Sequence, residues 1–445
     1  MFLKFFSRIK HDPIYFSDRI LGGEKPWKMQ KVIMEAVRDF PKVTVRSGHG
    51  VGKSWVAARI AIWFLYTHPY SIVLTTAPTL RQVESILWGE IKRQINKSRI
   101  PLGGKLTKKM LFLDNGWFAM GLSTDTPDRF QGFHAEHLLV IADEASGISD
   151  EIFESIESLL TSENSHLLLI GNPTNPSGYF GKSHREPTWK RFKISCFDSP
   201  NLKHGRTIYP NLVSKKWVDE KKKIWGEDSS IYLARVLGEF PKLGTNHLFI
   251  LNEIEMAKSR EVQPSSPCEV GVDVARFGDD RTIFCIRKGF HVEQLISYSG
   301  IDTMEVVSRL LSLSENLKLD CLKIDGVGIG AGVVDRLKQL GKVKIFTING
   351  SEKANHPEKY LNMRAEIFFG LKEIINQIDI PNDEELEGEL SQIRYGYTSA
   401  GLLKIESKDE IKRRLGRSPD KADALALAFA SPKKYNFLPM MGAYI

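Results

Sequence analysis

The sequence predicts an α/β protein of two domains, because its two halves show different rhythms of strands and helices. A length of 445 residues suits two or three domains rather than one. In residues 1–237, short apolar runs alternate with helical patterns, which is typical of a mostly parallel sheet covered on both faces. The expected strands are 43–45, 71–75, 138–142 and 167–170, and the expected helices are 53–66, 80–96 and 150–160.

The second half, residues 267–435, begins with three successive strand patterns and continues with alternating helices and strands. The strands are expected at 269–274, 282–287, 291–298, 321–325 and 344–348, with helices at 303–317 and 331–340. Three meandering strands followed by this alternation is the order of an RNase H-like domain. Residues 238–266 are rich in proline, glycine and serine and are expected to link the domains, and residues 436–445 are expected to form a tail.

The composition is that of a globular protein, and it argues against a zinc or redox Cys-x-x-Cys site, a membrane span and a signal peptide. Hydrophobic residues are 42% and charged residues 26% of the chain. Lys and Arg number 62 against 54 Asp and Glu, and the formal charge of +8 suits a polyanionic partner. None of the four cysteines forms a Cys-x-x-Cys pair, so reduced thiols are expected. The apolar run at 56–66 is too short for a membrane span and no signal-peptide pattern begins the chain, so a soluble protein is predicted.

A phosphate-binding loop is indicated at residues 47–54, which read Ser-Gly-His-Gly-Val-Gly-Lys-Ser between a strand and a helix. The pattern is G-x-x-x-x-G-K-[ST] with serine in place of the first glycine. Its expected nucleotide-binding residues are Ser47, Gly48, Gly50, Gly52, Lys53 and Ser54. The glycines turn backbone amides toward a phosphate at a helix N-terminus, Lys53 reaches the β- and γ-phosphates, and the Ser54 hydroxyl ligates Mg²⁺. The alternative is a glycine-rich turn that holds no ligand.

A second nucleotide-site element is expected at residues 137–145, where an apolar strand ends in Asp143 and Glu144. Asp143 is expected to hold Mg²⁺, and Glu144 to polarise the attacking water. Taken alone, the pattern also fits a core strand that ends in a solvated acidic turn. The loop at residues 47–54 favours the nucleotide-binding interpretation.

Four residues are weaker candidates around the same site. The Gln30 amide could read adenine, and Asn172, at the end of a strand, could sense the γ-phosphate. Either Arg46 or Arg129 could be an arginine finger that stabilises transition-state charge. The alternatives are a surface glutamine, a strand-ending turn and ordinary surface or salt-bridged arginines.

A cluster of acidic residues in the second half predicts a metal-dependent nuclease. Asp273 lies inside an apolar strand, where a carboxylate is costly unless paired or metal-bound. Asp325 ends another strand, and Asp420 and Asp423 begin an Ala/Leu-rich helix. An RNase H-like sheet would bring them together around two Mg²⁺ or Mn²⁺ ions. Asp273 could instead be structural, Asp325 a turn residue, and Asp420 or Asp423 a helix cap, and which of the last two ligates metal stays open.

Two runs of basic residues, one in each half of the chain, have an ambiguous function. One basic run consists of Lys408, Lys412, Arg413, Arg414 and Arg417, and another of Lys215, Lys216, Lys221, Lys222 and Lys223. Either run could follow a DNA backbone or form a solvated face. Asp279 and Asp280 are expected to be hairpin-turn residues rather than ligands.

Together these motifs resemble the large terminase subunits of tailed phages and prophages over roughly residues 27–430. The resemblance is carried by the phosphate-binding loop, Thr-Thr-Ala-Pro-Thr at 75–79, Ala-Asp-Glu-Ala at 142–145 and Gly-Asn-Pro-Thr at 171–174. In the second half it is carried by Gly-Val-Asp-Val-Ala at 271–275, Ile-Asp-Gly-Val-Gly-Ile-Gly at 324–330 and Ser-Pro-Asp-Lys-Ala-Asp-Ala-Leu at 418–425.

The resemblance implies a P-loop ASCE-type ATPase domain followed by an RNase H-like nuclease domain. It implies ATP-driven translocation of double-stranded DNA into a procapsid and cutting of concatemeric DNA. The implied partners are a small terminase subunit and the portal protein, with the chain forming a ring on the portal in the host cytoplasm, outside the mature virion. Asp143, Glu144 and Asn172 would serve ATP hydrolysis, with Arg129 as the finger, and Asp273, Asp325 and one of Asp420 or Asp423 would hold the nuclease metals.

Two other functions compete with the packaging enzyme. A DNA helicase or translocase without cleavage would explain the ATPase motifs but not the acidic cluster. A non-enzymatic scaffold on a degenerate nucleotide-binding fold would not need Lys53, Ser54, Asp143 and Glu144 together.

Overall fold

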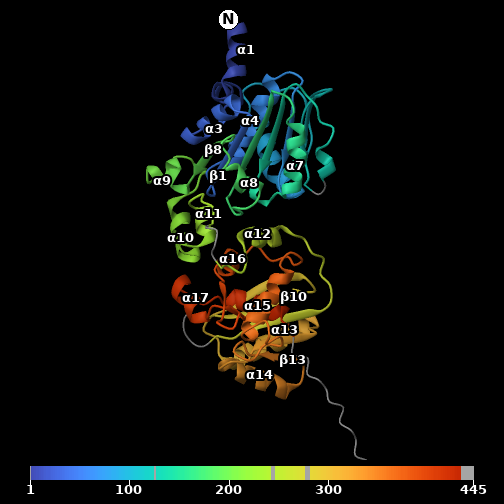
Figure 1. Cartoon of the computed structure of the whole chain (residues 1–445), viewed down its shortest axis with the longest axis vertical. Helices are drawn as coiled ribbons and strands as arrows, with labels where there is room; N and C mark the ends of the chain where they lie inside the picture. Colours follow the sequence, from blue (N-terminus) through green and yellow to red (C-terminus); the bar gives the residue numbers. More distant parts are fainter. Residues whose placement is uncertain (1, 125–126, 242–245, 276–280, 432–445) are drawn as a thin grey trace, which may run out of the picture. The chain divides into compact units, whose positions relative to one another are not determined.

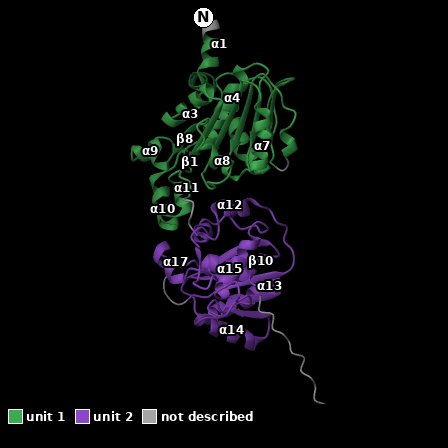
Figure 2. Ribbon diagram, viewed as in Figure 1, with its two compact units in different colours: residues 1–244 green, residues 245–445 purple. Residues whose placement is uncertain are grey.

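The computed structural model describes residues 2–124, 127–241, 246–275 and 281–431. The chain divides into two compact units, residues 1–244 and 245–445 (Figure 2). The hairpin-turn residues Asp279 and Asp280 and the expected tail at 436–445 lie outside the described residues. Within the described residues, every helix is too short or too polar to span a bilayer.

The first unit is built on an eight-stranded sheet in the order β3-β4-β5-β2-β6-β7-β1-β8 (Figure 1). The strands are β1 (Lys42–Ser47), β2 (Ile72–Thr76), β3 (Lys105–Leu106), β4 (Met110–Asp114), β5 (Trp117–Leu122), β6 (Leu138–Asp143), β7 (Ser165–Gly171) and β8 (Lys190–Ile194). The strands from β5 to β8 in this order pair in parallel, and β3, β4 and β5 pair antiparallel. The four strands expected from the sequence are therefore confirmed as the parallel centre of the sheet.

Helices of the first unit supply two apolar cores. They are α1 (Phe2–His11), α2 (Pro13–Phe16), α3 (Lys28–Asp39), α4 (Lys53–Thr67), α5 (Leu80–Gln82), α6 (Trp88–Asn96), α7 (Asp150–Leu159), α8 (Tyr179–Ser183), α9 (Pro200–Lys203), α10 (Lys215–Trp225) and α11 (Ser230–Arg235). Alternate residues of a strand point to opposite faces. Ile141 of β6 accordingly packs in the core that contains α3, α4 and α6, whereas Val140 packs in the core that contains α7.

The second unit has a five-stranded sheet in the order β11-β10-β9-β12-β13. The strands are β9 (Cys268–Asp273), β10 (Thr282–Lys288), β11 (His291–Tyr298), β12 (Cys321–Asp325) and β13 (Ile345–Ile348), and a separate hairpin contains β14 (Tyr395–Tyr397) and β15 (Leu403–Ile405). β9, β10 and β11 pair antiparallel, whereas β12 pairs in parallel with both β9 and β13. The order expected for an RNase H-like domain is therefore present.

Helices cover both faces of this second sheet. They are α12 (Leu251–Ser259), α13 (Thr303–Leu317), α14 (Ile329–Leu340), α15 (Met363–Ile374), α16 (Glu384–Leu390), α17 (Lys408–Leu415) and α18 (Asp420–Phe429). One core contains residues of α12, α15 and α18, and the other contains residues of α13 and α14. The linker expected at 238–266 is therefore wrong over part of its length, because Ile254 and Ala257 of α12 are buried in the core of the second unit.

Buried cations fix the C-terminal end of α18 to the sheet. The Ala428 carbonyl accepts hydrogen bonds from Arg287 Nε (2.7 Å) and Lys323 Nζ (2.9 Å). Glu269 of β9 pairs with both cations. A positive charge at a helix C-terminus interacts favourably with the free carbonyls there. These contacts hold α18 across β9 and so fix the position of its acidic N-terminal turn.

Gly271 provides a test of how closely α18 approaches the sheet. A Cβ at this position would lie 2.2 Å from the Ala424 oxygen and 2.3 Å from the Ala428 nitrogen, both backbone atoms of α18. We expect Gly271→Ala to lower the free energy of unfolding by about 1–3 kcal/mol, the usual cost of overpacking. Thermal unfolding followed by circular dichroism measures the change.

Gly370 is the matched control, since it lies exposed on α15 with open space around its missing Cβ. Gly370→Ala should stabilise the helix by about 0.5–1 kcal/mol, because alanine loses less backbone entropy on folding. Equal stability of the Gly271→Ala variant and the wild type would contradict the close packing of α18 on β9.

Candidate active sites

The phosphate-binding loop lies where β1 ends and α4 begins, as the sequence predicts. Gly50 (φ 63°) and Gly52 (φ 82°) adopt the left-handed backbone region that favours glycine. The loop is also enclosed: a Cβ on Gly48 would lie 2.7 Å from Cys196 Sγ, and one on Gly52 would lie 2.4 Å from Gln30 Nε2. The glycines are therefore required both by the turn and by the surrounding side chains.

Side chains from the start of α4 and from the ends of β6 and β7 meet behind this loop. Lys53 Nζ lies 3.3 Å from Asn172 Oδ1 and 3.7 Å from a Glu144 carboxylate oxygen. Ser54 Oγ donates to Asp143 Oδ2 at 3.0 Å. Since β6, β7 and β1 are neighbours in the sheet, their carboxyl ends bring Asp143, Glu144 and Asn172 to the loop. The structure thus gathers the predicted residues at one point.

Electrostatics in this cluster fit a site for a cation. Burial, reinforced by the neighbouring Glu144, raises the pKa of Asp143 to about 6, although Lys53 and Ser54 act in the opposite direction. Glu144 itself has a φ of 47°, a strained conformation for a residue with a Cβ. Gly171 permits it, because a Cβ there would lie 2.9 Å from the Ala145 nitrogen. Strain of this kind is found where a side chain must be aimed precisely.

Ser47 and Gln30 have local partners in the structure. Asn172 Nδ2 donates to the Ser47 carbonyl at 2.6 Å, which ties the start of the loop to β7. Gln30 is buried, its Oε1 accepts from the Trp27 backbone (3.1 Å), and its Nε2 donates to the Gly52 carbonyl (3.2 Å). Gln30 therefore links α3 to the loop, a contact that the expectation of adenine reading did not foresee.

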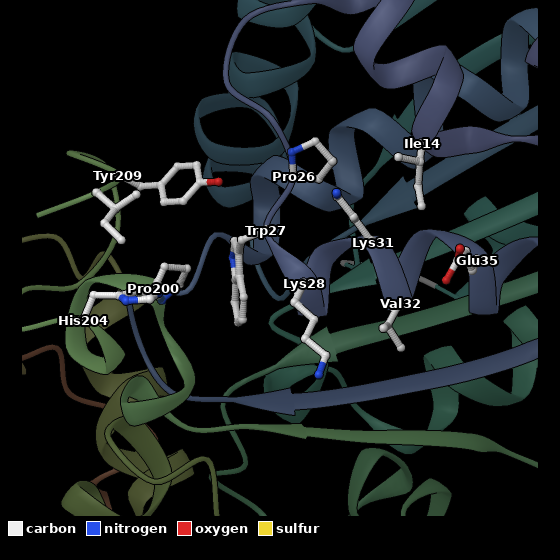
Figure 3. Close-up of a pocket in the computed structure, with 11 residues that line it drawn as sticks. Ile14, Pro26, Trp27, Lys28, Lys31, Val32, Glu35, Pro200, His204 and Tyr209 are labelled. Carbon is white, nitrogen blue, oxygen red and sulfur yellow. The ribbon is translucent and has the colours of Figure 1, made fainter.

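A cavity of about 560 Å³ lies beside Trp27, whose Nε1 donates to the Val51 carbonyl of the loop. Figure 3 shows the side chains around it, which include Pro26, Trp27, Lys28, Lys31, Pro200 and Tyr209. The segment that carries Tyr209 is tied to the loop as well, because Asn201 binds the Val213 carbonyl and the Val213 nitrogen binds the Gly50 carbonyl. Two segments that contribute to the cavity lining are therefore joined to the phosphate-binding loop through hydrogen bonds.

The two candidate arginine fingers lie in different settings. Arg46 forms an ion pair with Glu239 (2.6 Å) and lies over the Phe240 ring. The positive charge of Arg46 is therefore neutralised by an ion pair within the first unit. Arg129 is exposed in the short 3₁₀ helix Pro127–Phe130. Of the two, Arg129 retains the exposure that a finger needs.

In the second unit, acidic residues converge at one end of the sheet. Asp273 ends β9, Asp325 ends the parallel neighbour β12, and Asp420 and Asp423 lie in the first turn of α18, which packs on β9. Lys408 Nζ lies 3.1 Å from Asp273 Oδ1 and 2.9 Å from Asp423 Oδ2. The ammonium group thus bridges two carboxylates that are 150 positions apart in the sequence.

Burial dominates the electrostatics of this cluster. Burial, together with the neighbouring carboxylates, raises the pKa of Asp273 to about 7, although Lys408 acts in the opposite direction. Burial also raises the pKa of Asp325. Burial disfavours the charge of Lys408, but Asp273 and Asp423 outweigh this and raise the pKa of the ammonium. The negative charge of this cluster is therefore partly balanced by a half-buried cation, Lys408.

Asp420 and Asp423 differ in their partners. Asp423 Oδ1 accepts from Arg364 Nη1 at 2.6 Å, while its Oδ2 faces Lys408. Asp420 Oδ2 accepts from the Arg281 backbone nitrogen at 3.1 Å. Asp423 therefore shares a cation directly with Asp273, which favours it as the third carboxylate of the cluster.

The donor set fits a hard divalent cation, although the side chains would have to shift. Carboxylate oxygens are the ligands that Mg²⁺ and Mn²⁺ prefer. In the described part of the chain, no three Asp, Glu, His or Cys side chains are arranged to hold a metal as they stand. The position of Lys408 between Asp273 and Asp423 explains this, since its ammonium group lies where a cation between them would bind.

Much of the basic run at 408–417 has partners within the chain, an arrangement that neither alternative, a DNA-backbone contact or a solvated face, had included. Lys408 belongs to the acidic cluster. Arg414 pairs with Glu406 and Gln392, and Arg417 with Glu385 and Glu389. In the other run, Lys221 is buried and lies over the rings of Trp217 and Trp225.

Comparison with known proteins shows what the chain is similar to. No protein-family model matches it. It is 28% identical over 466 aligned residues to the probable terminase, large subunit, of Enterobacteria phage P7, and the alignment covers 97% of this chain and 92% of that protein. The chain is therefore similar over nearly its whole length to a protein described as a large terminase subunit. The expectation from the sequence motifs is thereby confirmed.

Two solved terminase structures are also similar. The nuclease domain of the large terminase subunit gp2 of bacterial virus Sf6 matches with 21% identity and a TM-score of 0.38, covering 42% of this chain and 99% of that domain. A large terminase from a thermophilic bacteriophage matches with 15% identity and a TM-score of 0.45, covering 91% of this chain and 98% of that protein.

Proposed function

We propose that this terminase chain is a DNA-packaging enzyme in which the first unit hydrolyses ATP and the second unit cuts DNA. One observation carries the proposal: two chemically different clusters lie in separate units of the same chain. Lys53, Glu144 and Asn172 surround a phosphate-binding loop. Asp273, Asp423 and Lys408 form an acidic cluster in the other sheet.

In the first unit, the loop amides and Lys53 hold the β- and γ-phosphates of ATP. Bound Mg²⁺ would neutralise phosphate charge, and Ser54 and Asp143 are the residues that would hold it. Glu144 orients and polarises the attacking water. Asn172 links Lys53 to the Ser47 carbonyl, and loss of the γ-phosphate would therefore change contacts at the ends of β1 and β7. Arg129 is proposed as the residue that stabilises the developing charge.

The adenine base is proposed to enter the cavity beside Trp27. Trp27 and Tyr209 offer aromatic surface, and Lys28 and Lys31 add positive charge near the loop. Gln30 supports this site by joining the backbone of Trp27 to that of Gly52. Its contribution to nucleotide binding is therefore through the position of the loop.

In the second unit, Asp273, Asp325 and Asp423 are proposed to hold the nuclease metals, with Asp420 beside them. Bound Mg²⁺ or Mn²⁺ would supply activation of water and stabilisation of the leaving 3′ oxygen of a phosphodiester. The burial of Asp273 keeps bulk water away from its carboxylate. Lys408, which pairs with Asp273 and Asp423, would have to give up these contacts for both carboxylates to hold a metal.

The substrate is proposed to be double-stranded concatemeric DNA, moved into a procapsid in the host cytoplasm. The proposed partners are a small terminase subunit and the portal protein, on which copies of this chain form a ring. These assignments rest on the family and on the formal charge of +8.

The decisive experiment measures both activities in one preparation. The purified chain should hydrolyse ATP with Mg²⁺ and convert supercoiled plasmid to linear fragments with Mn²⁺. A helicase or simple translocase would hydrolyse ATP and leave the plasmid intact, and a scaffold would do neither.

A further inference from the structure

Arg364 occupies an unusual position for a cation. It lies in the first turn of α15, two residues after the N-cap Asn362, whose side chain accepts from the Ala365 nitrogen. Helix N-termini carry partial positive charge, so an arginine there is electrostatically unfavourable unless something compensates. The compensation comes from outside the helix, because Arg364 Nη1 donates to Asp423 Oδ1 at 2.6 Å.

The geometry around the guanidinium group is fixed on several sides. The Arg364 side chain is only 15% exposed, and its guanidinium lies 4.9 Å from the centre of the Phe368 ring, one turn later on α15. The Arg364 backbone nitrogen donates to the Gly350 carbonyl after β13. Arg364 is therefore held in place by its helix, an aromatic ring and the loop that follows the edge strand β13.

Stability alone does not explain this arrangement. Among the described residues, Arg364 Nε and Nη2 are buried without a hydrogen-bond partner. A buried donor left unsatisfied costs about 1–3 kcal/mol, and a buried ion pair is often no more stable than a well-packed apolar pair. The single strong contact of Arg364 is with one oxygen of Asp423. The function of the guanidinium group therefore concerns the Asp423 carboxylate.

We infer that Arg364 is a positioning residue that turns the Asp423 carboxylate so that only Oδ2 faces the metal site. This inference rests on the proposed nuclease function. Asp423 Oδ1 is held by Arg364, whereas Asp423 Oδ2 faces the Lys408 ammonium that also binds Asp273. If a metal bound in place of the ammonium, Oδ2 is the oxygen of Asp423 that would hold it.

The alternative role is purely electrostatic, and the two roles predict opposite changes in metal affinity. If Arg364 only adds positive charge near the cluster, its removal should tighten Mn²⁺ binding, because like charges repel. If Arg364 orients Asp423, its removal should weaken Mn²⁺ binding by about 10–100-fold, the usual cost of losing a residue that orients a metal ligand. Lysine keeps the charge but loses the rigid planar fork of arginine.

The test is Mn²⁺ binding to the full-length chain without DNA or nucleotide, measured by the electron paramagnetic resonance signal of free Mn²⁺. The sites of interest are those that Asp273→Ala removes. We expect Arg364→Met and Arg364→Lys both to weaken these sites by about 10–100-fold. Arg309→Met is the control, since Arg309 pairs with Glu305 on the distant surface of α13 and should leave the affinity unchanged.

Each outcome decides the inference. Unchanged or tighter Mn²⁺ binding by Arg364→Met, with wild-type thermal unfolding, would overturn the positioning role and leave the nuclease proposal standing. If Arg364→Met does not fold, Arg364→Lys decides, because wild-type affinity in that variant would also overturn it. A wild-type chain with no Mn²⁺ sites that depend on Asp273 would overturn the nuclease proposal and this inference together.

Discussion

Replacing Lys53 with alanine is expected to abolish ATP hydrolysis while leaving Mn²⁺-dependent DNA cleavage at the wild-type rate. Lys53 Nζ is the cation of the phosphate-binding loop and lies within 3.7 Å of Glu144 and 3.3 Å of Asn172. Removing one preorganised group that stabilises transition-state charge typically costs about 100–1,000-fold in kcat. Phosphate release measures the ATPase, and plasmid linearisation measures the nuclease.

Lys182→Ala is the matched control for this variant. Lys182 lies on α8 of the same unit, is half-exposed and pairs with Asp150. An exposed pair of this kind contributes about 0–1 kcal/mol, so both activities should survive. A folded Lys53→Ala variant that hydrolyses ATP as fast as the wild type would contradict the proposed ATPase site of the first unit.

Replacing Asp273 with alanine should have the reverse effect, with loss of DNA cleavage and retention of ATP hydrolysis. Asp273 is 4% exposed and shares Lys408 with Asp423, so its carboxylate lies at the centre of the acidic cluster. Loss of a residue that merely orients a ligand costs about 10–100-fold in metal affinity, and loss of a ligand itself should exceed this. We expect plasmid cleavage to fall by roughly 100-fold or more on the same basis.

Asp335→Ala tests whether any lost carboxylate in the second unit has this effect. Asp335 is exposed on α14 and should be replaceable without change in either activity. Because removing Asp273 also leaves the Lys408 ammonium with one carboxylate fewer, thermal unfolding must accompany the assay. Loss of both activities together in a well-folded Asp273→Ala variant would count against two independent sites.

Local pattern was sufficient to predict the parts of the molecule in which buried strands end in functional residues. A strand buried on both faces is a continuous apolar run, and the polar residue that ends it is conspicuous. Asp143 after the run of β6 and Asp325 at the end of β12 were recognisable for this reason. The same logic identified β1, β2, β6 and β7 of the first sheet and β9, β12 and β13 of the second, but it missed β5 and β8.

Partners that come from distant parts of the chain were not predictable in this way. Lys408 was interpreted as one member of a basic run, and only the fold brings it onto Asp273, 135 positions earlier. Arg46 was a candidate finger until Glu239, 193 positions later, was found beside it. Arg364 was missed altogether, although an arginine in the first turn of a helix was a signal.

Some local signals were present and overlooked. The hairpin of β4 and β5 is formed by two apolar runs around Asn115 and Gly116, and Gly116 has the left-handed φ of 72° that such a turn uses. α12 was hidden by the prolines and serines that follow it, although Leu251, Ile254 and Ala257 repeat at helical spacing. Flanking composition was given more weight than periodicity at that point.

The measurement that tests the central claim most directly is a crystal structure of the full chain soaked with Mn²⁺, using the anomalous scattering of manganese to place the ions. The account predicts manganese peaks bound by Asp273, Asp325 and Asp423, with the Lys408 ammonium displaced from between Asp273 and Asp423. Peaks elsewhere, or an acidic cluster that keeps Lys408 and binds no manganese, would contradict it.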